Sequence, residues 1–120
     1  EQCGQAREKA YRAPVLMLVV VDGDRGAPEI DLAERLLSAG CAVQNMLLMA
    51  TAQGYGSALT SGKALKAASL RALFRLSACE QALCFISIGT VLSRKAARAR
   101  PMAGTYVSTL DADRGVVPGF

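Results

Sequence analysis

The sequence predicts an α+β fold in which one sheet carries helices. Three observations support this fold class. Residues 15–21 and 82–89 are continuous apolar runs typical of buried strands, residues 32–53 form a long apolar helical pattern, and residues 63–76 have amphipathic helical spacing. The order is strand, long helix, helix, strand and strand, so we expect a sheet that is completed by strands from elsewhere.

The composition is that of one globular domain. The 120 residues are 52% apolar and 20% charged, which argues against disorder, and the net charge is +4. Much of that charge lies in residues 93–101 (SRKAARARP), so a local anion site is a better interpretation than a basic surface. Few aromatic side chains are available to stack on bases, and nucleic acid is therefore not an expected partner.

The chain has four cysteines without a CxxC pair and no histidine, so we expect no metal site. Cys41 lies inside the apolar helical pattern, where it is expected to be a small buried hydrophobe rather than half of a disulfide. Residues 13–21 are too short to span a bilayer, and Gln44 and Asn45 interrupt the longer apolar stretch. A buried helix, no membrane association and a cytoplasmic location are the expectations.

The first half of the chain predicts one strand and one long helix. Residues 5–11 are expected to form a short polar helix and residues 15–21 a strand, followed by a loop rich in Gly, Asp and Pro. Asp31 is a suitable helix N-cap, and Glu34 three positions later completes a capping box. Gly54 is expected to end the helix in a left-handed conformation.

The long helix is apolar on more than one side, so we expect it to be buried on more than one side. A domain of this size has little material to surround such a helix, and a subunit interface is the natural place for its second face. Gly40 in the helix interior predicts close backbone packing. The two apolar stripes are Leu32, Leu36, Val43, Met46 and Ala50 on one side, and Leu37, Cys41 and Leu48 on the other.

The second half of the chain predicts a helix and two strands. Residues 56–62 are expected to form a glycine-rich loop, and residues 63–76 a helix that turns Leu65, Leu70, Leu73 and Leu76 inward. The remaining expectations are a buried strand at 82–89, a basic loop at 94–101, a short edge strand at 105–109 and a loosely held tail at 111–120.

Four segments occur in an order that is typical of one known family: RAPVLMLVV (12–20), SAGCAVQNMLLMATAQGYGSALTSG (38–62), FISIGT (85–90) and RARP (98–101). Over these segments, from about Tyr11 to Val107, the chain resembles the flavin-dependent nitroreductases, in particular the short single-domain NAD(P)H nitroreductases. The resemblance implies a central, mainly antiparallel sheet flanked by helices. It also implies FMN bound non-covalently at the interface of a homodimer that the long helix helps to form.

The chemistry implied by the resemblance is a ping-pong reaction. NAD(P)H reduces the flavin, and the flavin then reduces a nitroaromatic or quinone-like small molecule. We expect no catalytic side chain, because in such an enzyme the cofactor carries the electrons and the protein supplies position and electrostatics.

The resemblance assigns contact with the FMN ring to ALTSG, residues 58–62. The backbone N–H groups of Ser61 and Gly62 are expected near the redox-active edge of the ring, with Leu59 and Thr60 beside them. Close relatives carry Trp-Arg in place of Leu59 and Thr60, so this chain lacks a stacking ring and a cation there. Without the resemblance, the same residues would be an ordinary connection between helices.

The resemblance also assigns the FMN phosphate to a basic residue after the last core strand. Arg100, before Pro101, is the closest match and Arg98 the next, and the planar fork of a guanidinium suits phosphate. Arg94 and Lys95 fit a solvated charged loop equally well.

The helix end is the assigned contact for the nicotinamide nucleotide. On physical grounds it is a plain helix C-terminus, whose dipole does not favour phosphate. Gln44 and Asn45 are expected to be satisfied buried polar groups or to form interface hydrogen bonds. The residues assigned to NAD(P) are Met49, Ala50, Thr51, Ala52, Gln53 and Gly54.

The family has an N-terminal section, with an Arg-Arg-Ser-type motif that holds the flavin phosphate, ahead of the part that matches this chain. The chain starts at Glu1 rather than at methionine, so residues 1–120 are expected to be the C-terminal portion of one nitroreductase-like domain. Two other function classes stay open. One is a cofactor-free dimerisation or interaction module, and the other is an anion- or RNA-binding domain built on residues 94–100.

Overall fold

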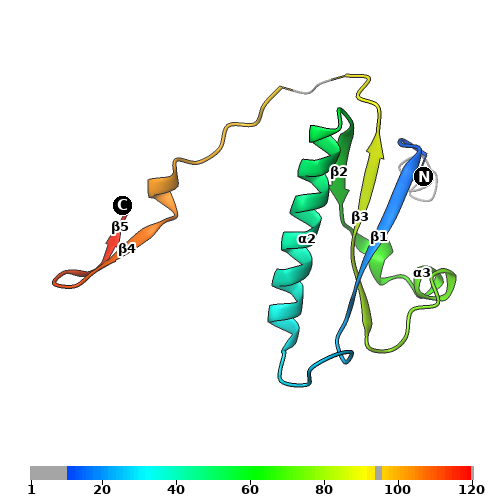
Figure 1. Cartoon of the computed structure of the whole chain (residues 1–120), viewed down its shortest axis with the longest axis horizontal. Helices are drawn as coiled ribbons and strands as arrows, with labels where there is room; N and C mark the ends of the chain where they lie inside the picture. Colours follow the sequence, from blue (N-terminus) through cyan, green and yellow to red (C-terminus); the bar gives the residue numbers. More distant parts are fainter. Residues whose placement is uncertain (1–10, 94–95, 120) are drawn as a thin grey trace.

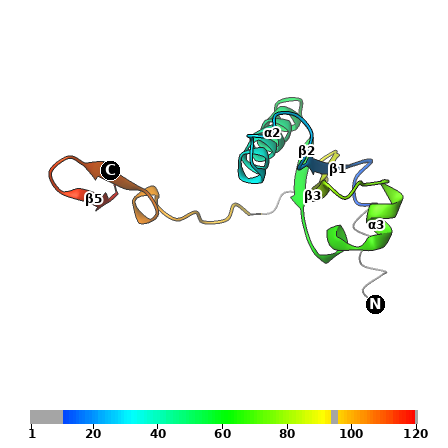
Figure 2. The same cartoon turned by 90° about the horizontal axis from the view of Figure 1, so that it is seen from below.

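The computed structural model describes residues 11–93 and 96–119, and its body is a three-stranded antiparallel sheet with helices on both sides. The strand order is β1-β3-β2, so β3 is central and β1 and β2 are the edges. Helix α2 covers one face of the sheet, and α3 lies on the other (Figures 1 and 2). The elements of this body are β1 (Val15–Asp22), α2 (Leu32–Ala52), β2 (Gly56–Thr60), the 3₁₀ helix η1 (Lys63–Lys66), α3 (Ala68–Leu73) and β3 (Glu80–Gly89).

Both apolar runs are strands, as their pattern predicts. β1 pairs with β3 from Val15 opposite Ile88 to Asp22 opposite Glu80, with one irregularity between Val19 and Val20. Continuous apolar sequence suits these strands because helices cover both faces of the sheet. The core lies between the sheet and α2: Ile86 is completely buried, and Val43 and Cys84 pack against it.

Residues 56–62 were expected to form a loop, and this expectation is wrong for its first five residues. They form β2, which pairs with β3 from Gly56 opposite Gly89 to Thr60 opposite Phe85. The positive φ of Gly54, 84°, ends α2 and turns the chain back along the sheet. Small residues form a strand here because the central strand supplies the hydrogen-bonding partner, which local sequence does not reveal.

Helix α2 begins as predicted. The Asp31 side chain accepts a hydrogen bond from the backbone N–H of Glu34 at 2.9 Å. Within the chain, Val43 and Ala50 are the buried residues of α2, because the sheet covers one side only. Burial of its second side at a subunit interface stays a prediction. On the second stripe, Leu37 is 71% exposed, Leu48 is 57% exposed, and Cys41 is exposed too.

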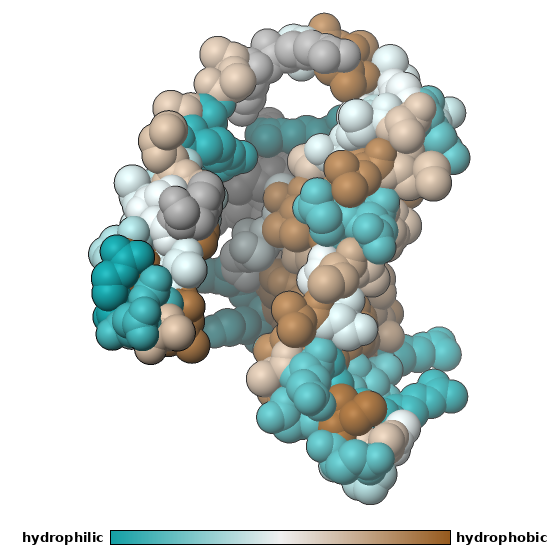
Figure 3. All heavy atoms as spheres, turned by 60° about the vertical axis from the view of Figure 1, so that its left-hand side comes forward, coloured by the Kyte–Doolittle hydropathy of each residue, from teal (hydrophilic) through white to brown (hydrophobic). Residues whose placement is uncertain are grey.

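Apolar side chains therefore remain on the outer surface of the molecule, and Figure 3 shows them interspersed with polar ones along the body. Gln44 and Asn45 are also exposed, so they are not buried polar groups. Apart from the backbone of the helix itself, no described atom lies within 4 Å of the position that a Cβ on Gly40 would take. Close packing at Gly40 stays a prediction.

The helix expected at 63–76 is broken into η1 and α3. Ala67, with ψ at 135°, is extended between them, and neither helix has a side-chain cap. Helices this short gain little from propensity alone. Leu73 is 76% exposed rather than inward, whereas Leu65, Leu70 and Leu76 are half-buried.

The C-terminal part leaves the body as an arm, defined here as residues 96–119. Residues 96–102 have no regular structure and lead to the 3₁₀ helix η2 (Ala103–Thr105) and to the antiparallel hairpin of β4 (Ser108–Asp111) and β5 (Gly115–Pro118). The expected edge strand begins three residues late, and the expected loose tail forms the second strand of the hairpin. The Arg114 guanidinium, 3.1 Å from the Asp111 carboxylate, lowers the pKa of Asp111 together with backbone N–H donors.

The hairpin lies apart from the sheet (Figure 1), and the radius of gyration is 18.6 Å. A compact chain of this length would have about 14 Å. Among the described residues, none of the helices has the length and apolar character needed to cross a membrane. The helix expected at 5–11 falls outside the described residues, apart from Tyr11 in a turn.

Candidate functional site

The body has two hollows of about 660 Å³ each, and no residue lines both of them. We call the first the helix-end hollow, because the C-terminal turns of α2 line it together with the start of β1 and the end of β3. We call the second the strand-end hollow, because it opens where β2 ends. The helix-end hollow is lined by Pro14, Val15, Asn45, Met46, Met49, Ala50, Gln53, Tyr55, Ile88, Gly89 and Thr90, and the strand-end hollow by Ser61, Gly62, Lys63, Leu65, Lys66, Arg71, Gln81, Ala82 and Leu83.

The helix-end hollow contains half of the residues expected to meet NAD(P). Met49, Ala50 and Gln53 line it, and the amide of Asn45 lies among apolar neighbours. The other three do not line it. Thr51 donates its hydroxyl to the Leu47 carbonyl at 3.0 Å, Ala52 is exposed, and Gly54 makes the turn into β2.

The strand-end hollow contains the two residues whose backbone is expected at the FMN ring. Gly62 has φ 154° and ψ −175°, a conformation that is essentially restricted to glycine, and its carbonyl accepts the N–H of Leu65 at 3.1 Å. Within the described ranges, the N–H groups of Ser61 and Gly62 donate to no protein acceptor. Two donors are thus presented beside an open hollow.

Leu59 and Thr60 lie on β2, opposite Ile86 and Phe85, rather than in the loop that was expected. Both are exposed, and neither lines a hollow. They place Ser61 and Gly62 at the end of a paired strand, so the position of the two donors is fixed by the sheet.

The arginines expected at the FMN phosphate lie elsewhere. Arg98 and Arg100 are exposed on the irregular part of the arm and line neither hollow. Arg94 and Lys95 fall outside the described residues. A single copy of the chain, in this arrangement, does not bring Arg98 and Arg100 beside Ser61 and Gly62.

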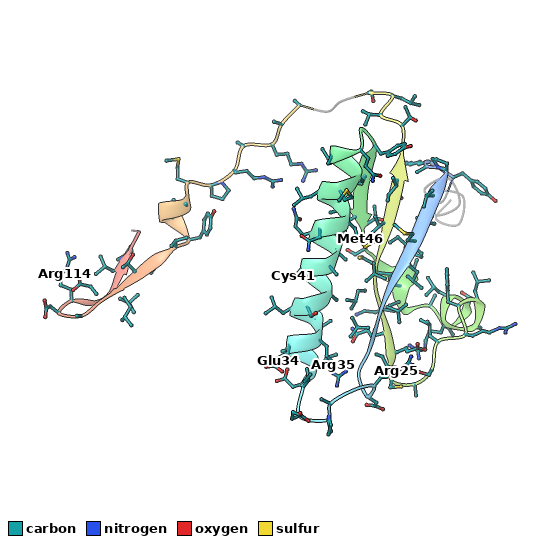
Figure 4. The ribbon with its side chains drawn as sticks, viewed as in Figure 1. Arg25, Glu34, Arg35, Cys41, Met46 and Arg114 are labelled. Atoms are coloured by element: carbon teal, nitrogen blue, oxygen red, sulfur yellow. The ribbon has the colours of Figure 1, made fainter. Side chains whose placement is uncertain are left out.

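The loop between β1 and α2 is fixed by one side chain. The Arg35 guanidinium donates to the backbone carbonyls of Ile30 and Ala27, each at 3.0 Å, and to those of Asp22 and Arg25. Figure 4 shows Arg35 at the base of α2, facing this loop. The backbone N–H groups of Asp24 and then Arg25 lower the pKa of the Asp22 carboxyl at the same corner.

One of the described thiols, Cys84, lies in the core. Burial raises the pKa of Cys84, which keeps this core thiol protonated. Cys41, Cys79 and Cys84 are free, and in the part of the chain that the structure describes no group of acidic, cysteine or histidine residues is arranged to hold a metal ion.

Residues 2–90 match the model of the nitroreductase family. The chain belongs to that family. Its three-stranded antiparallel sheet, helix α2 along one face and the turn into β2 form part of a nitroreductase-like fold. This agrees with the fold class expected from the sequence.

Two curated proteins that carry the name "Putative NAD(P)H nitroreductase" are similar to this nitroreductase-family chain. One, from Haemophilus influenzae, is 32% identical over 94 residues, covering 78% of this chain and 51% of that protein. The other, YdjA from Escherichia coli K12, is 31% identical over 86 residues, covering 72% of this chain and 46% of that protein. The chain therefore spans about half the length of the curated relatives it matches.

A solved structure has the same fold. The nitroreductase-like family protein from Bacillus cereus superposes with a TM-score of 0.71 at 18% identity, over 84% of this chain and 54% of that one. As with the curated relatives, the similarity covers about half of the larger protein.

Two groups of hollow-lining residues escaped the sequence analysis. Asn45 and Tyr55 join the helix-end hollow because the Gly54 turn folds β2 back beside α2. Lys63, Lys66 and Arg71 join the strand-end hollow. The sequence does contain a pattern that could have indicated them, since three cationic residues follow Ser61 and Gly62 within nine residues. The same pattern is typical of the polar face of a helix.

Proposed function

We propose that the chain is part of an FMN-dependent oxidoreductase that uses NAD(P)H to reduce nitroaromatic or quinone-like small molecules. The observation that carries the proposal is the pair of backbone donors at Ser61 and Gly62, which have no protein acceptor in the described residues and lie beside the strand-end hollow of a nitroreductase-family chain. The names of the two curated relatives support the general reaction class.

The residues of this chain fit one part of FMN. An electron-rich ring edge needs fixed N–H donors that require no rearrangement, and a strand end held in register by β3 supplies them. Glycine suits position 62, because any other residue would be strained at that φ. We propose Leu59, Thr60, Ser61 and Gly62 as the contacts of the ring.

The proposed contacts with the FMN phosphate require a second copy of the chain. Arg98 and Arg100 have the fork geometry that phosphate favours, but they lie on the arm, away from the strand-end hollow. We propose that a homodimer completes the site, with the exposed side of α2 at the interface. That side presents large apolar residues such as Leu37 and Leu48 without a cover in the described chain.

When bound, FMN would supply the redox chemistry that links NAD(P)H to the acceptor in two half-reactions. The protein would contribute position and charge stabilisation. Ser61 and Gly62, beside the strand-end hollow, would hold the ring edge, and the end of α2 at Met49–Gly54, part of which lines the helix-end hollow, would orient the nicotinamide nucleotide. Three of those six residues line one apolar hollow with amides at its rim, which suits a planar ring. A cytoplasmic location is part of the proposal.

The experiment is the absorbance spectrum of the purified protein, with and without added FMN followed by desalting. Retained flavin bands, bleached by NAD(P)H and restored by a nitroaromatic, are the expected result. A colourless protein that retains no added FMN would contradict the proposal and favour the cofactor-free interaction module.

A further inference from the structure

The strand-end hollow has a charge pattern that flavin-ring contact does not explain. Its charged lining residues are Lys63, Lys66 and Arg71, all of them cationic. Ser61 and Gln81 add a hydroxyl and an amide, which can both donate hydrogen bonds. The polar part of the lining thus consists of hydrogen-bond donors and positive charges, and Leu65, Ala82 and Leu83 form its apolar part.

The two lysines lie on the same side of their helix. η1 is a 3₁₀ helix, in which residues three apart are eclipsed, and Lys63 and Lys66 are three apart. Neither forms an ion pair within the described residues, where the single ion pair is Arg114 with Asp111 on the hairpin. Two like charges held together without a carboxylate repel each other until an anion enters.

Arg71 adds a fixed guanidinium to this pair. It donates to the backbone carbonyls of Glu80, at 3.0 Å, and Ser77, both of them neutral acceptors. The Glu80 carboxylate accepts the N–H of Ser77 at 2.7 Å and does not line the hollow. The positive charge of Arg71 is therefore positioned but not neutralised by an ion pair.

We infer that the strand-end hollow binds an anionic group, carboxylate or phosphate, of a substrate. This substrate is the small molecule that exchanges electrons with the flavin proposed to lie at Ser61 and Gly62. This inference rests on the proposed function, because it places the substrate beside the proposed flavin contacts. Lys63 and Lys66 hold the anionic oxygens, and Arg71 adds to the field that attracts them. The site selects negatively charged substrates over neutral ones of the same shape.

The test compares substrates matched in size and different in charge. The acceptor pair is 4-nitrobenzoate and 4-nitrobenzamide, and the reductant pair is NADPH and NADH. The variant is Lys63→Gln/Lys66→Gln, and its control is Arg12→Gln/Arg75→Gln, which removes two positive charges at exposed positions outside the hollow. The measurement is KM and kcat for each substrate in the FMN-loaded protein at low ionic strength.

We expect the lysine variant to raise KM about tenfold for the more negatively charged member of one pair, with kcat and the KM of the other member little changed. A rise for 4-nitrobenzoate identifies a carboxylate of the acceptor, and a rise for NADPH identifies the phosphate of the reductant. Added salt should erase the difference in the parent protein. Equal KM values for both members, or the same change in the control variant, would overturn the inference.

Two further measurements separate this inference from the proposed function. If the lysine variant weakens binding of FMN but not of riboflavin, the hollow holds the phosphate of the flavin itself, and the substrate site is refuted. If the parent protein takes up no flavin, calorimetry of 4-nitrobenzoate and NADPH binding to the parent and the lysine variant decides whether the anion site exists. Binding that depends on the two lysines would keep the anion site and end the redox function, and equal binding by parent and variant would end both.

Discussion

Arg35 donates to more backbone carbonyls than any other described side chain. Its guanidinium reaches four of them in the loop that joins β1 to α2, and no carboxylate competes for it. The planar fork makes this possible, since its donors point in fixed and different directions. One residue thus fixes the path of the chain between the sheet and its longest helix.

Replacing Arg35 with Ala should destabilise the protein by about 1–3 kcal/mol, because partly buried carbonyls lose a charged donor. Arg35→Lys should recover little, because an ammonium cannot reach four carbonyls together. Urea unfolding measures both effects. The matched control is Arg25→Ala, where the side chain forms no hydrogen bond in the described residues and the change should stay within about 0.5 kcal/mol. Equal loss in both variants would contradict this role.

The carboxyl of Asp22 should make the free energy of unfolding depend on pH in the acid range. Its pKa lies below the ordinary value of 3.8, chiefly through the N–H groups of Asp24 and Arg25. A carboxyl whose folded pKa is lowered contributes stability above its unfolded pKa, and the contribution disappears as pH falls through the folded pKa. Asp22→Asn should therefore lower stability at neutral pH, and the difference from the parent should disappear as pH falls through the folded pKa of Asp22.

The measurement for Asp22 is the urea midpoint of parent and variant across the acid range. Asp24→Asn is the control, because the Asp24 carboxylate accepts no hydrogen bond among the described residues. A constant difference between Asp22→Asn and the parent at every pH would show that the charge is unimportant.

At the scale of elements, helix α2 shows which structural features can be predicted from local sequence. Its cap at Asp31, its length and its end at Gly54 follow from sequence, because caps and left-handed glycines act over a few residues. The exposure of α2 does not follow from sequence, because hydrophobic periodicity shows that a helix face is apolar but not what covers that face. The outward face with Leu37 and Leu48 is the consequence.

Gly40→Leu on α2 should weaken the proposed homodimer. A Cβ added at Gly40 meets no described atom outside the helix backbone within 4 Å, and Leu has better helix propensity than Gly, so folding of one copy should tolerate the change. Sedimentation of the protein at several concentrations measures the dimer, and circular dichroism confirms the helix. A variant that stays fully dimeric would exclude Gly40 from the interface.

Strand β2 and the region after it show where secondary structure cannot be predicted from local sequence. The residues Gly56, Ser57 and Ala58 have weak strand propensity and become a strand through pairing with β3, thirty residues away. The segment expected to be one helix breaks at Ala67, and the cations of η1 then lie on one side. Ser61 and Gly62 came from the family pattern, whereas Lys63 and Lys66 needed the fold to bring them beside Gln81.

At the scale of the whole molecule, the chain is a small sheet body and a separate hairpin. Among the described residues, five buried apolar ones form the core, and many large apolar ones remain on the surface. The matched relatives are about twice as long, so the complete fold has more material than these residues provide. In the part of the chain that the structure describes, β1 and β2 are the edges of the sheet, and its completion by strands from elsewhere stays a prediction.

Arg100→Ala should weaken FMN binding if assembly brings the arm to the strand-end hollow. Loss of one charge-assisted contact corresponds to about a tenfold or larger rise in Kd. Quenching of flavin fluorescence measures it, with riboflavin as the ligand that should show no change. The control variant is Arg114→Ala, which removes a paired arginine from the hairpin. Unchanged FMN affinity in Arg100→Ala would refute the assignment of this arginine to the phosphate.

The irregular stretch at 96–102 also makes the state of the arm easy to follow. Trypsin cleaves after exposed arginines in extended backbone, so it should cut after Arg98, whereas Pro101 protects the bond after Arg100. The cut releases a fragment that contains the β4–β5 hairpin. If a flavin phosphate or a second copy covers this stretch, digestion there slows, and the lifetime of the intact band on a gel reports assembly without any measurement of turnover.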